Sequence, residues 1–114
     1  MWLMTKHGFY SIVERKPGEF HVRARERQDI ENLLKGVPFP DIELFETPDA
    51  DYGYRLVVGK EDVLVILKFL GETLDYENFK GKIDMTPDQK RKPYHEVWQV
   101  MADALGAYGR KGRA

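Results

Sequence analysis

The spacing of hydrophobic residues changes period several times along this chain, and each period predicts a different secondary structure. The clearest change lies between Glu19 and Leu34. The first half of this stretch alternates polar and apolar residues, which predicts a strand. Its apolar face consists of Phe20, Val22 and Ala24. The second half has helical spacing, with apolar residues at Ile30, Leu33, Leu34 and Val37. We expect a helix there, with Asp29 as its N-cap and Gly36 as its C-terminal stop.

Two stretches further upstream favour extended structure, because they are rich in aromatic and β-branched residues. They span residues 2–7 and 9–15, and Gly8 separates them as a bulge or as a bend in one long strand. Lys16-Pro17-Gly18-Glu19 has the composition of a tight turn. Residues 9–15 and 20–25 are therefore expected to pair as a β-hairpin.

The next part of the chain repeats this order of strands and helix. Residues 41–46 alternate and predict a third strand, and residues 54–58 predict a fourth. A helix then opens at residues 59–62, where acidic side chains complement the positive end of the helix dipole. Its apolar stripe consists of Val63, Ile66, Leu67, Leu70 and Leu74.

Shorter elements are expected beyond this helix. Residues 75–80 predict a short helix, and Thr86-Pro87-Asp88-Gln89 has the form of a capping box. A turn at Pro93 then leads into a final amphipathic helix. The stripe of that helix consists of Tyr94, Val97, Trp98, Met101 and Leu105.

These elements predict an α+β fold of ferredoxin-like type, in the order ββαββα. Its four-stranded antiparallel sheet carries the helices on one face, and a C-terminal helix is added. We expect one domain over residues 1–105 and a flexible basic tail over residues 106–114. Strand 9–15 has apolar residues on both faces, so the open face of the sheet is expected to be covered by the C-terminal helix or by a second copy in a homodimer.

Composition narrows the function classes without choosing one. The chain has 114 residues, of which 42% are hydrophobic and 32% charged, which is typical of one globular domain. Its net charge of −1 gives no overall attraction to nucleic acid or to a membrane. It contains no cysteine, which excludes disulfides and thiolate chemistry. No apolar run approaches the ~20 residues of a membrane span, so we expect a cytoplasmic protein without membrane contact.

Five sequence segments carry a resemblance to known proteins. They are MWLMTKHGFYSIV (residues 1–13), VRAR (22–25, followed by Asp29), DYGYR (51–55), DYENFK (75–80) and YHEVW (94–98). In combination they resemble a family of small uncharacterised bacterial proteins. The resemblance covers nearly the whole chain and implies a free-standing, single-domain bacterial protein of ferredoxin-like type. It implies no activity and no site residue.

The first candidate site is a basic edge of the predicted sheet. The polar face of strand 20–25 presents His21, Arg23 and Arg25, and Arg55 joins them if its strand buries its own apolar residues. A basic sheet face with aromatic residues can bind RNA or single-stranded DNA by stacking and phosphate contacts. Alternatively, the arginines pair with nearby acidic residues as ordinary surface ion pairs. The available partners are Asp41, Glu43, Glu46, Asp49 and Asp51.

The second candidate site is a cleft formed by polar and aromatic residues from distant segments. Its residues are His7, Tyr10, Tyr76, Asn78, Lys80 and His95. The three histidines lack the ligand spacing of a metal helix, and no nucleophile elbow or phosphate loop occurs. We therefore expect no metal and no cofactor, and we name no catalytic residue.

The sequence favours a non-enzymatic binding or regulatory module that associates with itself and whose ligand is unknown. A module that binds RNA or single-stranded DNA through the basic sheet face is the first alternative. A small enzyme with an unidentified site is the second.

Overall fold

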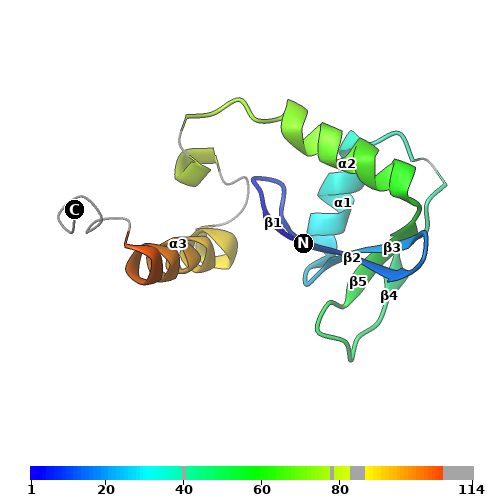
Figure 1. Ribbon diagram of the computed structural model, residues 1–114, viewed down its shortest axis with the longest axis horizontal. Coiled ribbons are helices and arrows are strands. Elements are labelled where there is room, and N and C mark those ends of the chain that lie inside the picture. Colours follow the sequence, from blue (N-terminus) through cyan, green and yellow to red (C-terminus); the bar gives the residue numbers. More distant parts are fainter. Residues whose placement is uncertain (40, 78, 83–86, 107–114) are drawn as a thin grey trace. The chain divides into compact units, whose positions relative to one another are not determined.

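The computed structural model describes residues 1–39, 41–77, 79–82 and 87–106. Contacts within the chain divide it into two units, Met1–Glu77 and Asn78–Ala114, and each is described by itself. The first unit has the α+β architecture that the sequence predicts, with an antiparallel sheet and two helices (Figure 1). The second unit contains the expected C-terminal helix. The single domain over residues 1–105 stays a prediction.

The sheet of the first unit has five strands, and the expected number of four is wrong. The elements of this unit are β1 (Trp2–Met4), β2 (Phe9–Lys16), β3 (Glu19–Ala24), α1 (Arg27–Gly36), β4 (Phe45–Glu46), β5 (Tyr54–Val58) and α2 (Lys60–Glu72). The strands lie in the order β1-β2-β3-β5-β4, and each neighbouring pair is antiparallel. The predicted hairpin of β2 and β3 is confirmed.

The additional strand is β1, which folds back onto β2 instead of continuing into it. Both alternatives for Gly8, a bulge and a bend in one long strand, are therefore wrong. The chain reverses between Met4 and Phe9, where the N–H and the hydroxyl of Thr5 both donate to the Gly8 carbonyl, at 3.0 and 2.9 Å. The Phe9 N–H donates to Oδ2 of Asp29 at 3.1 Å. The last contact comes from α1, so local periodicity alone does not specify the reversal.

The predicted third strand, residues 41–46, is much shorter in the structure. Strand geometry is confined to Phe45 and Glu46 of β4, an edge strand. The apolar residues Ile42 and Leu44 that produce the alternating pattern pack against the core instead. The period-2 pattern here therefore indicates which side chains are buried, without the ladder of hydrogen bonds that defines a strand.

Both helices of the first unit bury most of their predicted stripes, but Leu74 lies beyond the end of α2 and is exposed, and one cap differs. The helix α2 begins at Lys60, directly after its N-cap Gly59, as expected. The helix α1 begins at Arg27 with Glu26 as N-cap, so the assignment of Asp29 as N-cap is wrong. Asp29 lies within the first turn of α1 and is buried, and its carboxylate accepts a hydrogen bond from β2. Its carboxylate joins α1 to β2 and does not cap its own helix.

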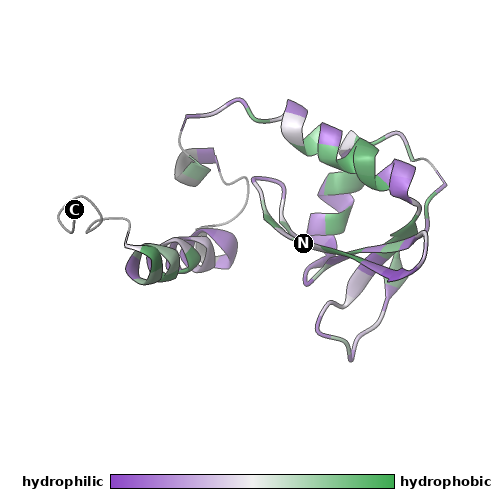
Figure 2. Ribbon diagram, in the orientation of Figure 1, coloured by the Kyte–Doolittle hydropathy of each residue, from purple (hydrophilic) through white to green (hydrophobic). Residues whose placement is uncertain are grey.

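The core lies between the helices and one face of the sheet. Hydrophobic residues concentrate in the middle of α2 and alternate with polar ones along the strands (Figure 2). The buried cluster includes Tyr10, Ile12, Val22, Ala24 and Leu56 from the strands and Ile30, Leu33, Val63 and Ile66 from the helices. Cross-strand partners Ile12, Val22 and Leu56 form its centre. The opposite sheet face, which we call the open face, carries the residues of the other parity.

The ring of Phe69 in α2 packs so closely on Gly36 of α1 that it leaves no room for a side chain there. A Cβ atom at this position would lie 2.0 Å from Cε1 of Phe69, whose ring packs on His7 at a centroid distance of 4.9 Å. We expect Gly36→Ala to lower the free energy of unfolding by about 1–3 kcal/mol, because the ring must leave this contact. Gly71→Ala is the control: its Cβ would meet nothing within 4 Å, so helix propensity should make it stabilising by up to ~1 kcal/mol. Urea denaturation measures both, and equal effects would contradict the close packing.

The second unit begins with a 3₁₀ turn, Phe79–Lys82, close to the short helix predicted over residues 75–80. A π-helical turn, Pro87–Arg91, leads directly into α3 (Lys92–Leu105), with Pro93 in its first turn. Thr86 of the predicted capping box, and residues 107–114 of the tail, lie outside the described residues. Tyr94 is buried and stacks on Phe79 at 5.5 Å. The other residues of the predicted stripe are exposed in the described structure, namely Val97, Trp98, Met101 and Leu105.

Candidate anion-binding surface

One row of side chains crosses all five strands on the open face. The register pairs Trp2 with Ser11, Ser11 with Arg23, Arg23 with Arg55, and Arg55 with Phe45. Directly opposite residues of antiparallel strands point to the same side of a sheet. These five residues, which we call the open-face row, therefore place two arginines at the centre and an aromatic ring at each end.

Arg23 is held against the sheet by two contacts. Its Nη2 donates to Oγ of Ser11 at 2.7 Å, and its Cζ lies 4.5 Å from the centroid of the Tyr52 ring. Ser11 is buried, so its hydroxyl positions the guanidinium and is not an accessible nucleophile. The Nε atom of Arg23 is buried and has no hydrogen-bond partner among the described residues.

Arg55 faces Arg23 across the strand pair and is held by neighbouring acceptors. Its Nη1 lies 3.2 Å from Nδ1 of His21, whose Nε2 lies 3.1 Å from Oε2 of Glu19. Its Nη2 donates to the Tyr52 carbonyl at 3.4 Å. Burial lowers the pKa of the Arg55 guanidinium, and the charges of Arg23 and Arg15 lower it further.

The loop between β4 and β5, residues 47–53, completes the surface. Tyr52 from this loop is buried and supports a second arginine, because Cζ of Arg25 also lies 4.5 Å from its ring centroid. Arg25 donates to the Asp51 carbonyl at 3.0 Å. Together the loop and the strands form a hollow of about 440 Å³, which we call the arginine hollow. It is lined by Trp2, Arg15, Arg23, Arg25, Ala50, Asp51, Tyr52 and Arg55.

The four arginines of the hollow have no acidic partner in the part of the chain that the structure describes. The ion pairs found there join Lys6 to Asp75, His21 to Glu19, and Arg27 to both Glu31 and Glu46. The expected pairing with acidic neighbours is therefore not found for Arg23, Arg25 or Arg55 among the described residues. Asp51 contributes the one carboxylate of the lining, against four guanidinium groups.

The structure thus brings together all four residues of the basic edge predicted from the sequence, namely His21, Arg23, Arg25 and Arg55. Sequence reasoning missed Arg15, Trp2 and Tyr52. The signal for Arg15 was available, since it has the same parity as Ser11 on β2. Trp2 joins the open-face row because β1 reverses, and Tyr52 lines the arginine hollow because its loop folds over the sheet.

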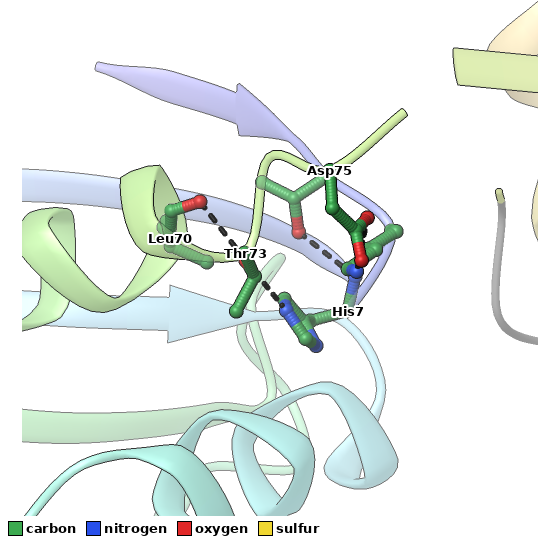
Figure 3. A network of polar contacts seen from close by, with 6 residues as sticks. His7, Leu70, Thr73 and Asp75 are labelled. Atoms are coloured by element: carbon green, nitrogen blue, oxygen red, sulfur yellow. Dashed lines mark hydrogen bonds and ion pairs between the residues drawn. The ribbon is translucent and has the colours of Figure 1, made fainter. Parts of the chain in front are cut away.

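Two residues of the second predicted site, His7 and Tyr10, have structural roles within the first unit. Tyr10 is fully buried, and its hydroxyl donates to the Asp29 carbonyl at 2.7 Å, so its place in an accessible cleft is wrong. His7 instead belongs to a structural network (Figure 3). Its Nε2 lies 3.0 Å from Oγ1 of Thr73, and that hydroxyl donates to the Leu70 carbonyl at 2.9 Å.

The remaining residues of that prediction belong to different units of the chain or lie outside the described residues. Tyr76 lies next to Lys6, whose Nζ is 5.8 Å from its ring centroid and 3.2 Å from Oδ1 of Asp75. His95 belongs to the second unit and stacks on Trp98 at 5.7 Å. Asn78 and the side chain of Lys80 lie outside the described residues.

Other site classes find no support in the described part of the chain. No group of three or more histidine, cysteine or acidic residues is arranged there to hold a metal ion. None of its helices is both long enough and apolar enough to cross a membrane. No known protein family, curated protein or solved structure matches this chain. The resemblance to a bacterial family stays a prediction.

Proposed function

We propose that this chain is a non-enzymatic binding module whose arginine hollow binds a phosphate-bearing anion. The observation that supports this most directly is the pairing of Arg23 with Arg55 in the sheet register. Like charges directly opposite each other on one face destabilise a sheet. Neither residue has a carboxylate within ion-pairing distance among the described residues. A bound anion would convert this repulsion into two attractive contacts.

Phosphate suits this hollow better than a carboxylate or a halide. Guanidinium groups donate in a planar fork that matches two oxygens of a phosphate, and four such groups surround the space. Tyr52 and Ser11 hold Arg25 and Arg23 in place before any ligand arrives. Preorganisation of this kind reduces the entropy lost on binding. The volume of about 440 Å³ lies within the usual range for small-ligand sites.

Self-association through the open face is the second candidate. It is favoured by the exposed apolar edges of this face, where Trp2, Phe45 and Val57 are more than one third exposed. A symmetric dimer through the arginine hollow would, however, bring the arginines of two copies together. That arrangement requires intervening anions, so it depends on the same chemistry as the first proposal.

We also propose a fold topology and a cellular location for this protein. The order β2-β3-β5-β4, with the elements ββαββα, supports a ferredoxin-like sheet whose usual C-terminal edge strand comes early in the chain. In this scheme β1 is an addition at the edge. We also propose a bacterial origin, which rests on the sequence resemblance, and a cytoplasmic location.

Pyrophosphate is the simplest ligand with which to test the proposal. Isothermal titration should detect binding to the full chain, with affinity that falls as salt rises. Arg23→Gln and Arg55→Gln should each weaken it about tenfold or more, because each removes a charge-assisted hydrogen bond worth ~1.5–3 kcal/mol. The matched controls Lys35→Gln and Lys68→Gln each remove one exposed positive charge from a helix and should change affinity less than twofold.

Folding of each variant must be compared by circular dichroism, because Arg23 also packs on Tyr52. Titrations at several protein concentrations separate the two candidates, since a dimer bridged by anions would strengthen apparent binding as the protein is concentrated, whereas binding to a monomer would not change. Undetectable pyrophosphate binding at low salt, or equal losses in the arginine and lysine variants, would refute the proposal.

A further inference from the structure

We infer that the anion is the backbone of a single-stranded nucleic acid that lies along the open-face row, from Trp2 to Phe45. This inference rests on the proposed function and adds the identity of the ligand. The proposed hollow accounts for Arg23 and Arg55 but does not explain why the row ends in aromatic rings on both sides. A single-stranded nucleic acid explains both features, because its phosphates can contact the arginines while its bases stack on the rings.

The two terminal rings are unusually accessible for aromatic side chains. Trp2 is 73% exposed and Phe45 is 42% exposed. Trp2 is braced from one side by Phe9, at a centroid distance of 6.2 Å and an interplanar angle of 58°. That contact leaves the rest of the indole open to solvent. Exposed rings beside a positively charged groove are the platforms on which unpaired bases stack.

The length of the row distinguishes a strand from a mononucleotide. Neighbouring strands lie about 4.8 Å apart, so the four steps from β1 to β4 span roughly 19 Å. The arginine hollow includes Trp2 and Arg55 but not Phe45. A mononucleotide in the hollow could thus use the first ring only. A ligand that contacts both rings must continue past Arg55, across β5 to β4.

Charge and base geometry favour a single strand over a duplex. Stacking on Trp2 and Phe45 needs base faces that are free of a paired helix. The chain carries a net charge of −1, so attraction to a long duplex is weak outside the row. Glu46, next to Phe45 in the sequence, is already paired with Arg27. Attraction is therefore local to the row, and moderate, salt-sensitive affinity is expected.

The test uses the full chain and fluorescein-labelled dT10 and rU10, followed by anisotropy at low salt. Trp2→Ala and Phe45→Ala should each weaken oligonucleotide binding about tenfold, the effect of losing one stacked base. Phe45→Ala should bind pyrophosphate within twofold of the unaltered chain, because Phe45 lies outside the arginine hollow. Trp98→Phe changes the second of the two tryptophans, in the other unit, and is the matched control. In that background, the oligonucleotide should quench the emission of Trp2.

The possible results distinguish failure of the nucleic-acid inference from failure of the anion-binding proposal. If pyrophosphate binds but the oligonucleotides bind no more tightly, or if Trp2→Ala and Phe45→Ala leave their affinity unchanged, the inference fails while the anion site stands. A duplex that binds as tightly as the single strand also overturns it. If neither ligand binds, both fail. Comparison of dT10 with rU10 shows which sugar the surface accepts.

Discussion

Replacing Gly8 by alanine should lower the free energy of unfolding by about 3 kcal/mol or more, since overpacking against a fixed backbone is among the costliest single changes. A Cβ atom at Gly8 would lie 2.4 Å from Cγ and 2.6 Å from Cβ of Asp29. The Cβ of Asp29 is fixed by the backbone of α1, so a side-chain rotation cannot relieve the overlap. Either the β1–β2 turn or the start of α1 must move, and the bond from the Phe9 N–H to Asp29 is then lost.

Gly59→Ala is the matched control, because a Cβ there meets nothing within 4 Å. It should change stability by less than ~1 kcal/mol, the usual range for an N-cap glycine. The double variant Gly8→Ala/Asp29→Ala should lose less than the sum of its single changes, since it removes the Cγ and carboxylate from the overlap. Urea denaturation followed by circular dichroism measures the stability of the double variant, of Gly8→Ala and Asp29→Ala, and of the Gly59→Ala control. A Gly8→Ala protein as stable as the unaltered chain would show that the turn relaxes freely.

This contact also shows where sequence periodicity stops being informative. The strands Phe9–Lys16, Glu19–Ala24 and Tyr54–Val58 and the helix Lys60–Glu72 lie within two residues of the predicted ranges. Each has a strong pattern and a turn or glycine at its boundary. The reversal of β1 does not follow from any local pattern. It depends on Asp29, twenty residues later, which looks like an N-cap in the sequence and binds β2 in the structure.

The candidate site was likewise predictable from the sequence only in part. Side-chain parity predicted that His21, Arg23 and Arg55 share a face, because a strand alternates regardless of its neighbours. Parity could not show whether nearby acidic residues reach the arginines. In the described structure they do not, because Tyr52 of the intervening loop packs on Arg23 and Arg25 instead. The position of a loop residue depends on tertiary packing, which leaves no periodic signal.

The buried carboxylate of Asp29 should make stability depend on pH in a direction opposite to that of most aspartates. Burial raises the pKa of Asp29 from 3.8 to about 6, and the hydrogen bond from Phe9 opposes this only in part. The folded state therefore holds the proton more tightly than the unfolded state does. Its contribution to stability is complete below about pH 4 and is lost as the pH rises through 6. A shift of about two units corresponds to roughly 3 kcal/mol.

Asp29→Asn isolates this effect from the titration of every other group. The stability of Asp29→Asn relative to the unaltered chain should rise by about 2–3 kcal/mol between pH 4 and pH 7.5. This happens because the unaltered chain must ionise a buried carboxyl over that range, whereas asparagine stays neutral. Asn can still accept the Phe9 N–H through its amide oxygen. Urea denaturation at four or five pH values measures the difference directly.

Asp49→Asn controls for the removal of one carboxylate, because Asp49 is exposed in the β4–β5 loop. Asp29→Ala provides a second comparison, since it removes both the titrating group and the acceptor for Phe9. It should be less stable than Asp29→Asn at every pH, and the gap should not vary between pH 4 and 7.5. If the difference between Asp29→Asn and the unaltered chain stays constant over that range, the carboxyl does not titrate there. Its burial against Gly8 would then be relieved in solution by local opening of the β1–β2 turn.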